Sequence, residues 1–124
     1  MQTDFLVIGS GIAGLTYALK VAEECPGKTV TILTKTQSDE TNTKYAQGGI
    51  AGVMDFDHDS FQKHIDDTII AGDGLCNKHI VEIVIKEGVD RINEIIEWGA
   101  RFDKEADGDY KLGKEGGHSE SRIL

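Results

Sequence analysis

The fold is decided by the stretch Asp4-Phe5-Leu6-Val7-Ile8-Gly9-Ser10-Gly11-Ile12-Ala13-Gly14. Its first half is a short apolar run with β-branched members, which is typical of a buried strand in a parallel sheet. Its second half is a GxGxxG turn, in which glycines allow a tight bend, close approach of backbone to phosphate and close packing of helix on strand. The stretch therefore predicts a strand that runs directly into a dinucleotide-binding turn.

The residues after this turn complete a recognisable unit. From Gly11 onward, apolar residues recur at helical spacing until Pro26-Gly27, which should end the helix. The run Thr29 to Leu33 then predicts a second strand. Strand, turn, helix and strand within about 30 residues form a right-handed βαβ crossover. This context favours dinucleotide binding over a purely structural glycine turn.

The rest of the chain predicts a long loop followed by helices. Residues 35–54 are polar, then glycine-rich, and show no helical or strand period. Residues 59–99 predict helices that begin after Ser60 and Asn77, with an interruption at Gly88 and a stop at Gly99. A small hairpin follows, made of Arg101-Phe102 and Tyr110-Lys111-Leu112 and joined through Asp107-Gly108.

Together these elements predict an α/β, Rossmann-like FAD/NAD(P)-binding domain with a helical insert and a small β-hairpin. Only two strands are predicted, whereas a doubly wound sheet needs at least about three or four. We therefore expect the domain to be incomplete and the chain to be the N-terminal portion of a longer protein. Its expected parts are a βαβ unit at 3–34, a flavin-contacting loop at 35–54, a helical region at 59–99, and a hairpin with a substrate-side loop at 100–124.

Composition and charge exclude several classes of protein. The 124 residues are 39% hydrophobic and 28% charged, which is globular composition. The formal net charge of -9 opposes a nucleic-acid partner. No apolar run has bilayer length and the first residues lack the basic flank of a signal peptide, so we expect a cytoplasmic protein with no membrane partner. Cys25 and Cys76 are too far apart for a CxxC pair, and the histidines lack ligand spacing, so we expect two reduced thiols and no metal.

The glycine turn alone does not distinguish NAD from FAD. In NAD sites an acidic residue about 20 positions beyond the turn accepts hydrogen bonds from the ribose hydroxyls. Thr34 and Lys35 stand at that position here. The missing acid argues against NAD, while Lys35 could either donate to ribose or phosphate oxygens or be only a solvated strand end.

Three further segments carry a resemblance to a known family. They are Val7-Ile8-Gly9-Ser10-Gly11-Ile12-Ala13-Gly14-Leu15, Tyr45-Ala46-Gln47-Gly48-Gly49-Ile50-Ala51, and Lys114-Glu115-Gly116-Gly117-His118-Ser119 with Arg122-Ile123-Leu124. Through them the chain resembles the succinate dehydrogenase and fumarate reductase flavoprotein family over almost its whole length. The third segment resembles the aspartate-oxidising members of that family.

The resemblance implies FAD as cofactor and assigns residues to it. The implied FAD-binding residues are Gly9, Ser10, Gly11, Ile12, Ala13 and Gly14 at the pyrophosphate, Lys35 beside the adenosine ribose, and Asn42, Thr43, Lys44, Tyr45, Ala46, Gln47, Gly48 and Gly49 on the flavin side. Backbone amides of a Gly-Gly segment can approach the flavin edge where negative charge develops on reduction. From the sequence alone, Gly48-Gly49 could also be only a bend in the chain.

Respiratory members of the family attach FAD covalently through a histidine at the position aligned with Asn42. Asparagine cannot form that bond, and no residue from Ser38 to Gly49 is a histidine. We therefore expect FAD to be bound non-covalently.

Two residues of the third segment are implied at the substrate. Glu115 aligns with a glutamate implicated in substrate recognition, and a carboxylate suits the α-ammonium group that aspartate has and succinate lacks. Without the resemblance, Glu115 would be interpreted as a solvated loop acid. His118 could orient Glu115, touch a substrate carboxylate or make only a structural hydrogen bond.

The implied function is FAD-dependent oxidation of L-aspartate to iminoaspartate, the first step of de novo NAD biosynthesis via quinolinate. Oxygen or fumarate would reoxidise the flavin, and quinolinate synthase would be a partner enzyme. Family residues that grip the substrate carboxylates would lie beyond Leu124, so we expect the chain to be inactive alone. One alternative is a fumarate reductase or succinate dehydrogenase flavoprotein subunit, against which Asn42 and the Glu115 segment argue. The other is a non-catalytic dinucleotide-binding module, which would not need the loop from Tyr45 to Ala51.

Overall fold

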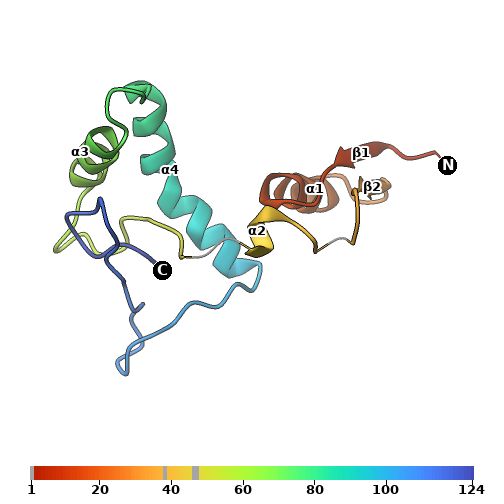
Figure 1. The fold of residues 1–124 in the computed structure, drawn as a ribbon. Coiled ribbons are helices and arrows are strands. Elements are labelled where there is room, and N and C mark those ends of the chain that lie inside the picture. The colour runs from red at the N-terminus through yellow and green to blue at the C-terminus, as the bar shows by residue number, and fades with distance from the viewer. Residues whose placement is uncertain (1, 38, 46–47) are drawn as a thin grey trace. The chain divides into compact units, whose positions relative to one another are not determined.

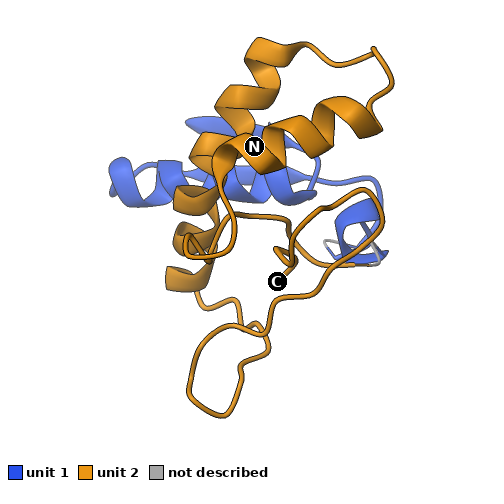
Figure 2. Cartoon of the chain, turned by 90° about the vertical axis from the view of Figure 1, so that its left-hand side faces the viewer, with its two compact units in different colours: residues 1–47 blue, residues 48–124 orange. Residues whose placement is uncertain are grey.

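The chain forms two compact units, residues 1–47 and residues 48–124, in a computed structural model that describes residues 2–37, 39–45 and 48–124 (Figures 1 and 2). The first unit contains β1 (Phe5–Ile8), α1 (Ile12–Glu24), β2 (Val30–Leu33) and α2 (Asn42–Tyr45). The second contains α3 (Phe61–Ala71) and α4 (Lys78–Glu97).

The first unit is the predicted βαβ crossover. β1 and β2 pair in parallel, with Phe5 opposite Val30 and Ile8 opposite Leu33, and α1 packs against both strands. Each strand begins one residue later than the sequence predicts. The reason lies in Asp4, whose carboxylate accepts hydrogen bonds from the Thr29 backbone N–H and hydroxyl, both at 2.9 Å, and so ties the two strand entries together through a side chain.

The sheet of the first unit has one buried layer. Val7 of β1 and Ala18 of α1 are buried, whereas Ile8 is 79% exposed and Leu33 is 56% exposed. Parallel sheets usually bury both faces, and their strands are therefore apolar almost throughout. The described part of the chain contributes two strands and a single covering helix to such a sheet.

The predicted loop at residues 35–54 contains one helical turn, α2, which the sequence analysis missed. The Thr41 hydroxyl accepts a hydrogen bond from the Lys44 backbone N–H at 3.1 Å, as an N-cap side chain does. The turn is too short to produce a helical period, so only the cap could have signalled it.

The two helices of the second unit begin where the sequence predicts. The Ser60 hydroxyl accepts from the Lys63 backbone N–H at 3.2 Å, and the Asn77 side-chain oxygen accepts from the Ile80 N–H at 3.3 Å. Each side chain thereby satisfies a backbone donor that the first helical turn leaves open.

The predicted interruption at Gly88 is wrong, because α4 runs unbroken from Lys78 to Glu97. A glycine inside a helix costs only about 1 kcal/mol relative to alanine. The buried side chains of Ile85 and Ile92 stand on either side of it and hold the helix against the core of the unit. The predicted stop is confirmed, since Gly99 has a φ of +104° just beyond the helix end.

The predicted hairpin forms as one isolated antiparallel bridge, between Lys104 and Tyr110, rather than as two strands that include Arg101 and Phe102. Its turn is where the sequence predicts, with Gly108 at a φ of +101°. The pairing is shifted because the Lys111 N–H donates to the carbonyl oxygen of Asp103 at 2.9 Å.

The end of the chain is held between two other segments of the second unit. Ile123 forms antiparallel bridges with Ala51 on one side and Gly113 on the other. Behind this small ladder, Val53, Ile65, Ile85 and Ile92 make up the buried apolar core of the unit.

No helix within the described ranges is both long enough and apolar enough to cross a bilayer.

Candidate functional site

The glycine turn between β1 and α1 requires glycine at two positions, for different reasons. Gly9 has a φ of +102°, a conformation that favours glycine. A Cβ atom added at Gly14 would overlap the carbonyl oxygen of Gly9 and approach the Val7 side chain to 3.2 Å. Gly14 is thus required for helix and strand to pack closely, as the fingerprint predicts.

The N-terminus of α1 is open and suited to an anion. Its N-cap residue, Gly11, makes no side-chain cap, and the first turn of the helix has no acidic residue. A Cβ added at Gly9 would meet no atom within 4 Å. The Gly9 N–H donates to the Leu33 carbonyl at 2.8 Å and the Ile12 N–H to the Thr43 hydroxyl at 3.2 Å. The positive end of the helix dipole attracts phosphate, so this turn fits the pyrophosphate of a dinucleotide.

Two side-chain hydroxyl groups form hydrogen bonds that connect this turn to neighbouring segments. The Thr43 hydroxyl accepts a hydrogen bond from the Ile12 backbone N–H at 3.2 Å, which brings α2 to the start of α1. The buried Ser10 hydroxyl donates to the Thr34 hydroxyl at 3.2 Å and so links the turn to the end of β2. The sequence marks Thr43 and Ser10 as cofactor residues but gives no sign of either hydrogen bond.

The other flavin-side residues of the first unit are exposed. Asn42 lies at the start of α2, and Lys35 lies just beyond β2. The Lys44 ammonium pairs with Asp39 at 2.6 Å. The Tyr45 hydroxyl donates to the Glu40 carboxylate at 2.7 Å, and this hydrogen bond raises the pKa of Tyr45. Ala46 and Gln47 lie outside the described residues.

Gly48 and Gly49 belong to the second unit, where backbone conformation accounts for the first and close packing for the second. Gly48 has a φ of +100°, and a Cβ added there would lie 3.4 Å from the Glu115 Oε1 atom. A Cβ at Gly49 would overlap the carbonyl oxygen of Leu124. The Ile50 N–H donates to that same carbonyl at 3.1 Å. Gly49 is therefore required by the close approach of residues 122–124, whereas Gly48 is favoured by its positive φ.

Glu115 and His118 lie at the two ends of one tight turn. The His118 N–H donates to the Glu115 carbonyl at 3.3 Å, and Gly117 between them has a φ of +88°. The Glu115 side chain is exposed, with its carboxylate beside Gly48. His118 is half-buried, and its Nδ1 lies 3.3 Å from Nη1 of Arg122, so its ring has a structural neighbour.

Arg122 is the functional candidate that the sequence analysis did not assign. Its side chain is fully buried. The guanidinium donates to both carboxylate oxygens of Asp59, through Nε at 2.7 Å and Nη2 at 2.8 Å. Its Nη1 donates to Asp67 Oδ2 at 2.6 Å. The two carboxylates raise the pKa of Arg122 against the opposing effect of burial, so the group is a permanent buried cation.

Asp67 joins this arginine to the turn that carries Glu115. Its Oδ2 accepts hydrogen bonds from the Ser119 backbone N–H at 2.7 Å and from the Ser119 hydroxyl at 2.8 Å. Burial acts to raise the pKa of Asp67, but the hydrogen bonds from Ser119 and Arg122 outweigh it and lower the pKa to about 2. Asp67 is therefore ionised at any physiological pH.

A buried histidine, His64, lies beside this network. It is 7% exposed, and its Nδ1 has no hydrogen-bond partner among the described residues. Its ring centroid is 5.7 Å from that of His118. Burial lowers the pKa of His64, and the nearby charge of Arg122 lowers it further, so the ring is neutral at pH 7.

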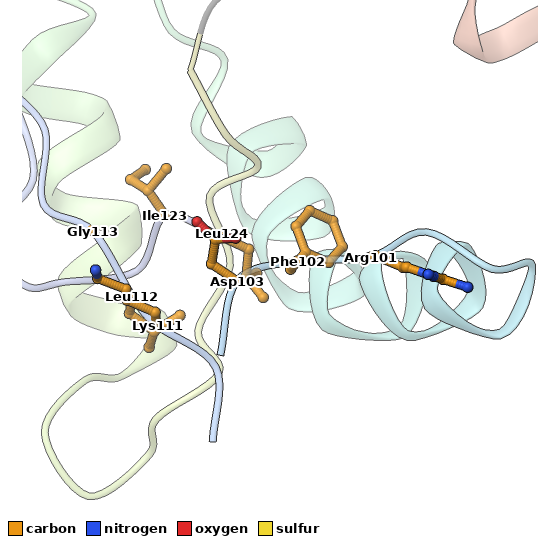
Figure 3. A pocket seen from close by; sticks show the side chains of 8 residues that line it. All are labelled: Arg101, Phe102, Asp103, Lys111, Leu112, Gly113, Ile123 and Leu124. Atoms are coloured by element: carbon orange, nitrogen blue, oxygen red, sulfur yellow. The ribbon is translucent and has the colours of Figure 1, made fainter. Parts of the chain in front are cut away.

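A surface pocket of the second unit lies apart from the predicted site residues. Figure 3 shows its lining, whose apolar members include Phe102, Leu112 and Ile123. Neither Glu115 nor Gly48 is among its lining residues, and its remaining members are Arg101, Asp103, Lys111, Gly113 and Leu124.

A parallel βαβ crossover with an open, glycine-lined helix N-terminus defines a dinucleotide-binding α/β protein. The profile of a family described as an FAD binding domain matches residues 4–124. The chain belongs to this FAD-binding family, which confirms the predicted fold class and the choice of FAD over NAD.

The curated relatives of the chain include L-aspartate oxidases. The chain is 50% identical over 121 residues to L-aspartate oxidase 2-a, chloroplastic, of Nicotiana tabacum, covering 98% of this chain and 18% of the relative. It is 48% identical over 126 residues to the L-aspartate oxidase of Yersinia pestis, covering 98% and 23%. The predicted resemblance to aspartate-oxidising proteins is confirmed, and the chain spans about a fifth of the length of these relatives.

Solved structures of respiratory flavoproteins share the fold. A variant of the E. coli quinol fumarate reductase matches with a TM-score of 0.89 at 30% identity, covering 99% of this chain and 21% of that one. Sdh1 of Mycobacterium smegmatis in complex with UQ1 matches with a TM-score of 0.86 at 35% identity, covering 98% and 20%.

Proposed function

We propose that the protein carrying this chain is an FAD-dependent oxidase that converts L-aspartate to iminoaspartate, with oxygen or fumarate as electron acceptor. Two findings support this function: the 48–50% identity to L-aspartate oxidases over 98% of the chain, and an exposed carboxylate, Glu115, next to a glycine-rich loop. The chain corresponds to a fifth of those relatives and supplies part of the FAD site. We propose that it is inactive by itself.

The cofactor would be held by the residues that the sequence analysis assigned. The turn from Gly9 to Gly14 would bind the pyrophosphate, because the start of α1 has no side-chain cap from Gly11 and no acidic residue in its first turn. Lys35 would lie by the adenosine ribose, and residues 42–49 would lie on the flavin side. Bound FAD supplies a hydride acceptor, and Asn42 leaves that cofactor without a covalent link.

These assignments give each part of the chain an expected role. Residues 3–34 would bind the pyrophosphate and residues 35–54 the flavin, while residues 59–99 would be scaffold. Residues 100–124 would carry the substrate-side loop.

Glu115 would select the substrate by charge. Its carboxylate is exposed and lies beside Gly48, the first residue of the loop in the second unit that is assigned to the flavin side. A carboxylate attracts the α-ammonium of aspartate, and succinate offers no such group.

The test is anaerobic flavin reduction in the full-length holoprotein. L-Aspartate should bleach the flavin absorbance, whereas succinate should do so far more slowly. Replacing Glu115 by Gln removes a charge-assisted hydrogen bond of about 1.5–3 kcal/mol and should raise KM for aspartate about 10- to 150-fold. The matched control is Glu105→Gln, the same change in the exposed hairpin, which should leave KM unaltered.

Measuring flavin reduction by aspartate and by succinate also distinguishes the proposed function from its alternatives. Structural similarity to quinol fumarate reductase favours a succinate- or fumarate-specific flavoprotein as the second candidate. Faster reduction of the flavin by succinate than by aspartate would select that candidate. A flavin that neither substrate reduces would indicate a non-catalytic module.

The place of this reaction in the cell is a further part of the proposal. We propose that the oxidation of aspartate is the first step of NAD biosynthesis, that it takes place in the cytoplasm, and that iminoaspartate then passes to quinolinate synthase. The plant relatives carry the word chloroplastic in their names, so location is tested separately, by fractionating cells and assaying each compartment.

A further inference from the structure

The loop from Gly113 to Ile123 is closed at its base and is held to α3 by two side chains, Asp67 at Ser119 and Lys63, whose ammonium pairs with the Glu120 carboxylate at 2.6 Å. At the base, the Gly113 N–H donates to the Ile123 carbonyl at 2.8 Å, and the Ile123 N–H donates back at 3.0 Å. Within the loop, the Lys114 ammonium donates to the Ser119 carbonyl at 2.6 Å. The turn that runs from Glu115 to His118 lies between these attachments.

Asp67 of α3 binds Ser119, the residue directly after the turn, through both the N–H and the hydroxyl of that serine. Oδ2 of Asp67 accepts both Ser119 donors and also the Nη1 donor of Arg122. Arg122 in turn lies 3.3 Å from the His118 ring nitrogen and is fixed from the other side by Asp59. One carboxylate thus holds both ends of the segment that follows the turn.

We propose that Asp67 and Arg122 are positioning residues that set the selectivity of Glu115 for a substrate ammonium group. Neither touches the substrate in this proposal. They fix the turn that places the Glu115 carboxylate beside Gly48, and charge recognition of an ammonium group requires that placement. This inference rests on the proposed function of Glu115.

The physical reason lies in the steep distance dependence of charge-assisted hydrogen bonds. A carboxylate that moves by about 1 Å from an ammonium group loses most of a directed hydrogen bond, whereas contacts with uncharged or distant parts of the substrate change little. A loosened turn should therefore impair binding of amino dicarboxylates and spare dicarboxylates that lack nitrogen.

The test compares Asp67→Asn with Asp66→Asn in the full-length holoprotein. Asp67→Asn keeps the size of the side chain but weakens its bonds to Ser119 and Arg122. Asp66 is the next residue on α3, is exposed, and accepts a hydrogen bond from Gln62, so it gives the same chemical change without touching the loop. We expect Asp67→Asn to raise KM for L-aspartate about tenfold or more, to leave the apparent affinity for fumarate within about twofold, and to leave the flavin spectrum unchanged. Asp66→Asn should change none of these.

A double-mutant cycle separates positioning from a general structural role. In the Glu115→Gln background, Asp67→Asn should have almost no further effect on KM for aspartate, because the group it positions is gone. Additive effects in the cycle would overturn the inference, as would an equal loss of affinity for aspartate and fumarate. If Asp67→Asn does not yield folded flavoprotein, Ser119→Ala takes its place. It removes one of the two Ser119 bonds, leaves Arg122 paired, and should act in the same direction more weakly.

The inference and the proposed function fail in different ways. A wild-type flavin that aspartate does not reduce contradicts the proposed function. A wild-type flavin that aspartate does reduce, together with additive effects of the Asp67 and Glu115 substitutions, contradicts the positioning role alone.

Discussion

Glycines without room for a side chain mark the tightest points of both units. At Gly14 the obstacle is backbone, the carbonyl of Gly9, and backbone cannot move aside as the end of a flexible side chain can. Gly88, in contrast, has open space where its Cβ would be. The two positions offer the same substitution with opposite outcomes.

Replacing Gly14 by Ala should separate α1 from β1 and lower the flavin content of the purified holoprotein. Replacing Gly88 by Ala should raise stability by about 0.5–1 kcal/mol, because alanine is the better helix former. Flavin absorbance per protein and the midpoint of thermal unfolding measure both effects. A Gly14→Ala protein with full flavin and an unchanged midpoint would contradict the close packing described for the turn.

Arg122 is the second residue for which we expect a large contribution to stability. Changing Arg122 to Met leaves two acceptors, Asp59 and Asp67, without their cation, and breaking a buried ion pair in this way typically costs about 3–5 kcal/mol. Arg91 forms an exposed pair with Glu94 at 3.2 Å, and pairs of that kind contribute about 0–1 kcal/mol. Urea unfolding of the two variants should show a large loss of unfolding free energy for Arg122→Met and at most a small loss for Arg91→Met. Equal losses would mean that burial of Arg122 does not matter.

Among the elements, those with local signals were predictable. The βαβ unit has a strand, a glycine turn and a helical period within one short stretch, and Ser60 and Asn77 cap their helices as their side chains suggest. α2 was missed because a single turn has no period. The break at Gly88 was wrongly predicted because packing of α4 outweighs the low helix propensity of one glycine.

The caps offer an element-scale prediction. Asn77→Ala should remove the hydrogen bond to the Ile80 N–H and lower the unfolding free energy by about 1 kcal/mol. Asn93 lies exposed within the same helix, four residues before its end, where Asn→Ala should instead stabilise by a few tenths of a kcal/mol, about the difference in helix propensity. Chemical denaturation of the two variants tests whether position rather than residue type decides the sign. Two losses of equal size would contradict a capping role.

On the scale of the molecule, acid should destabilise the protein in two steps. The folded-state pKa of His64 lies below its ordinary value of 6.5, so the unfolded chain binds a proton first and stability falls as pH drops below about 6.5. The pKa of Asp67 falls from 3.8 to about 2 on folding, so its contribution is complete above about pH 4 and is lost as pH approaches 2. Unfolding midpoints across this range, compared with those of His64→Leu, should show the first step only in the wild type. A first step of equal size in His64→Leu would assign it to other groups.

The motifs of the candidate site can be predicted from the sequence, whereas the long-range hydrogen bonds that hold these motifs in place cannot. The glycine turn and the Glu115 segment are local in sequence, and the turn's geometry follows from its residues. The bonds of Arg122 to Asp67 and Asp59 span 55 and 63 residues, and no spacing rule connects positions so far apart. The hydrogen bond from the Ile12 N–H to the Thr43 hydroxyl joins residues 31 positions apart, and it could not be predicted for the same reason.

The distance in sequence between Arg122 and its carboxylates also bears on how the second unit assembles. Closing a chain loop of that length costs entropy before any bond is made, and contacts of high sequence separation generally form late in folding. α3 must therefore exist, with Asp67 on its surface, before the guanidinium can be enclosed. Substitutions at Arg122 should then accelerate unfolding far more than they slow refolding, so that the last part of the unit to be ordered is the stretch bearing Glu115.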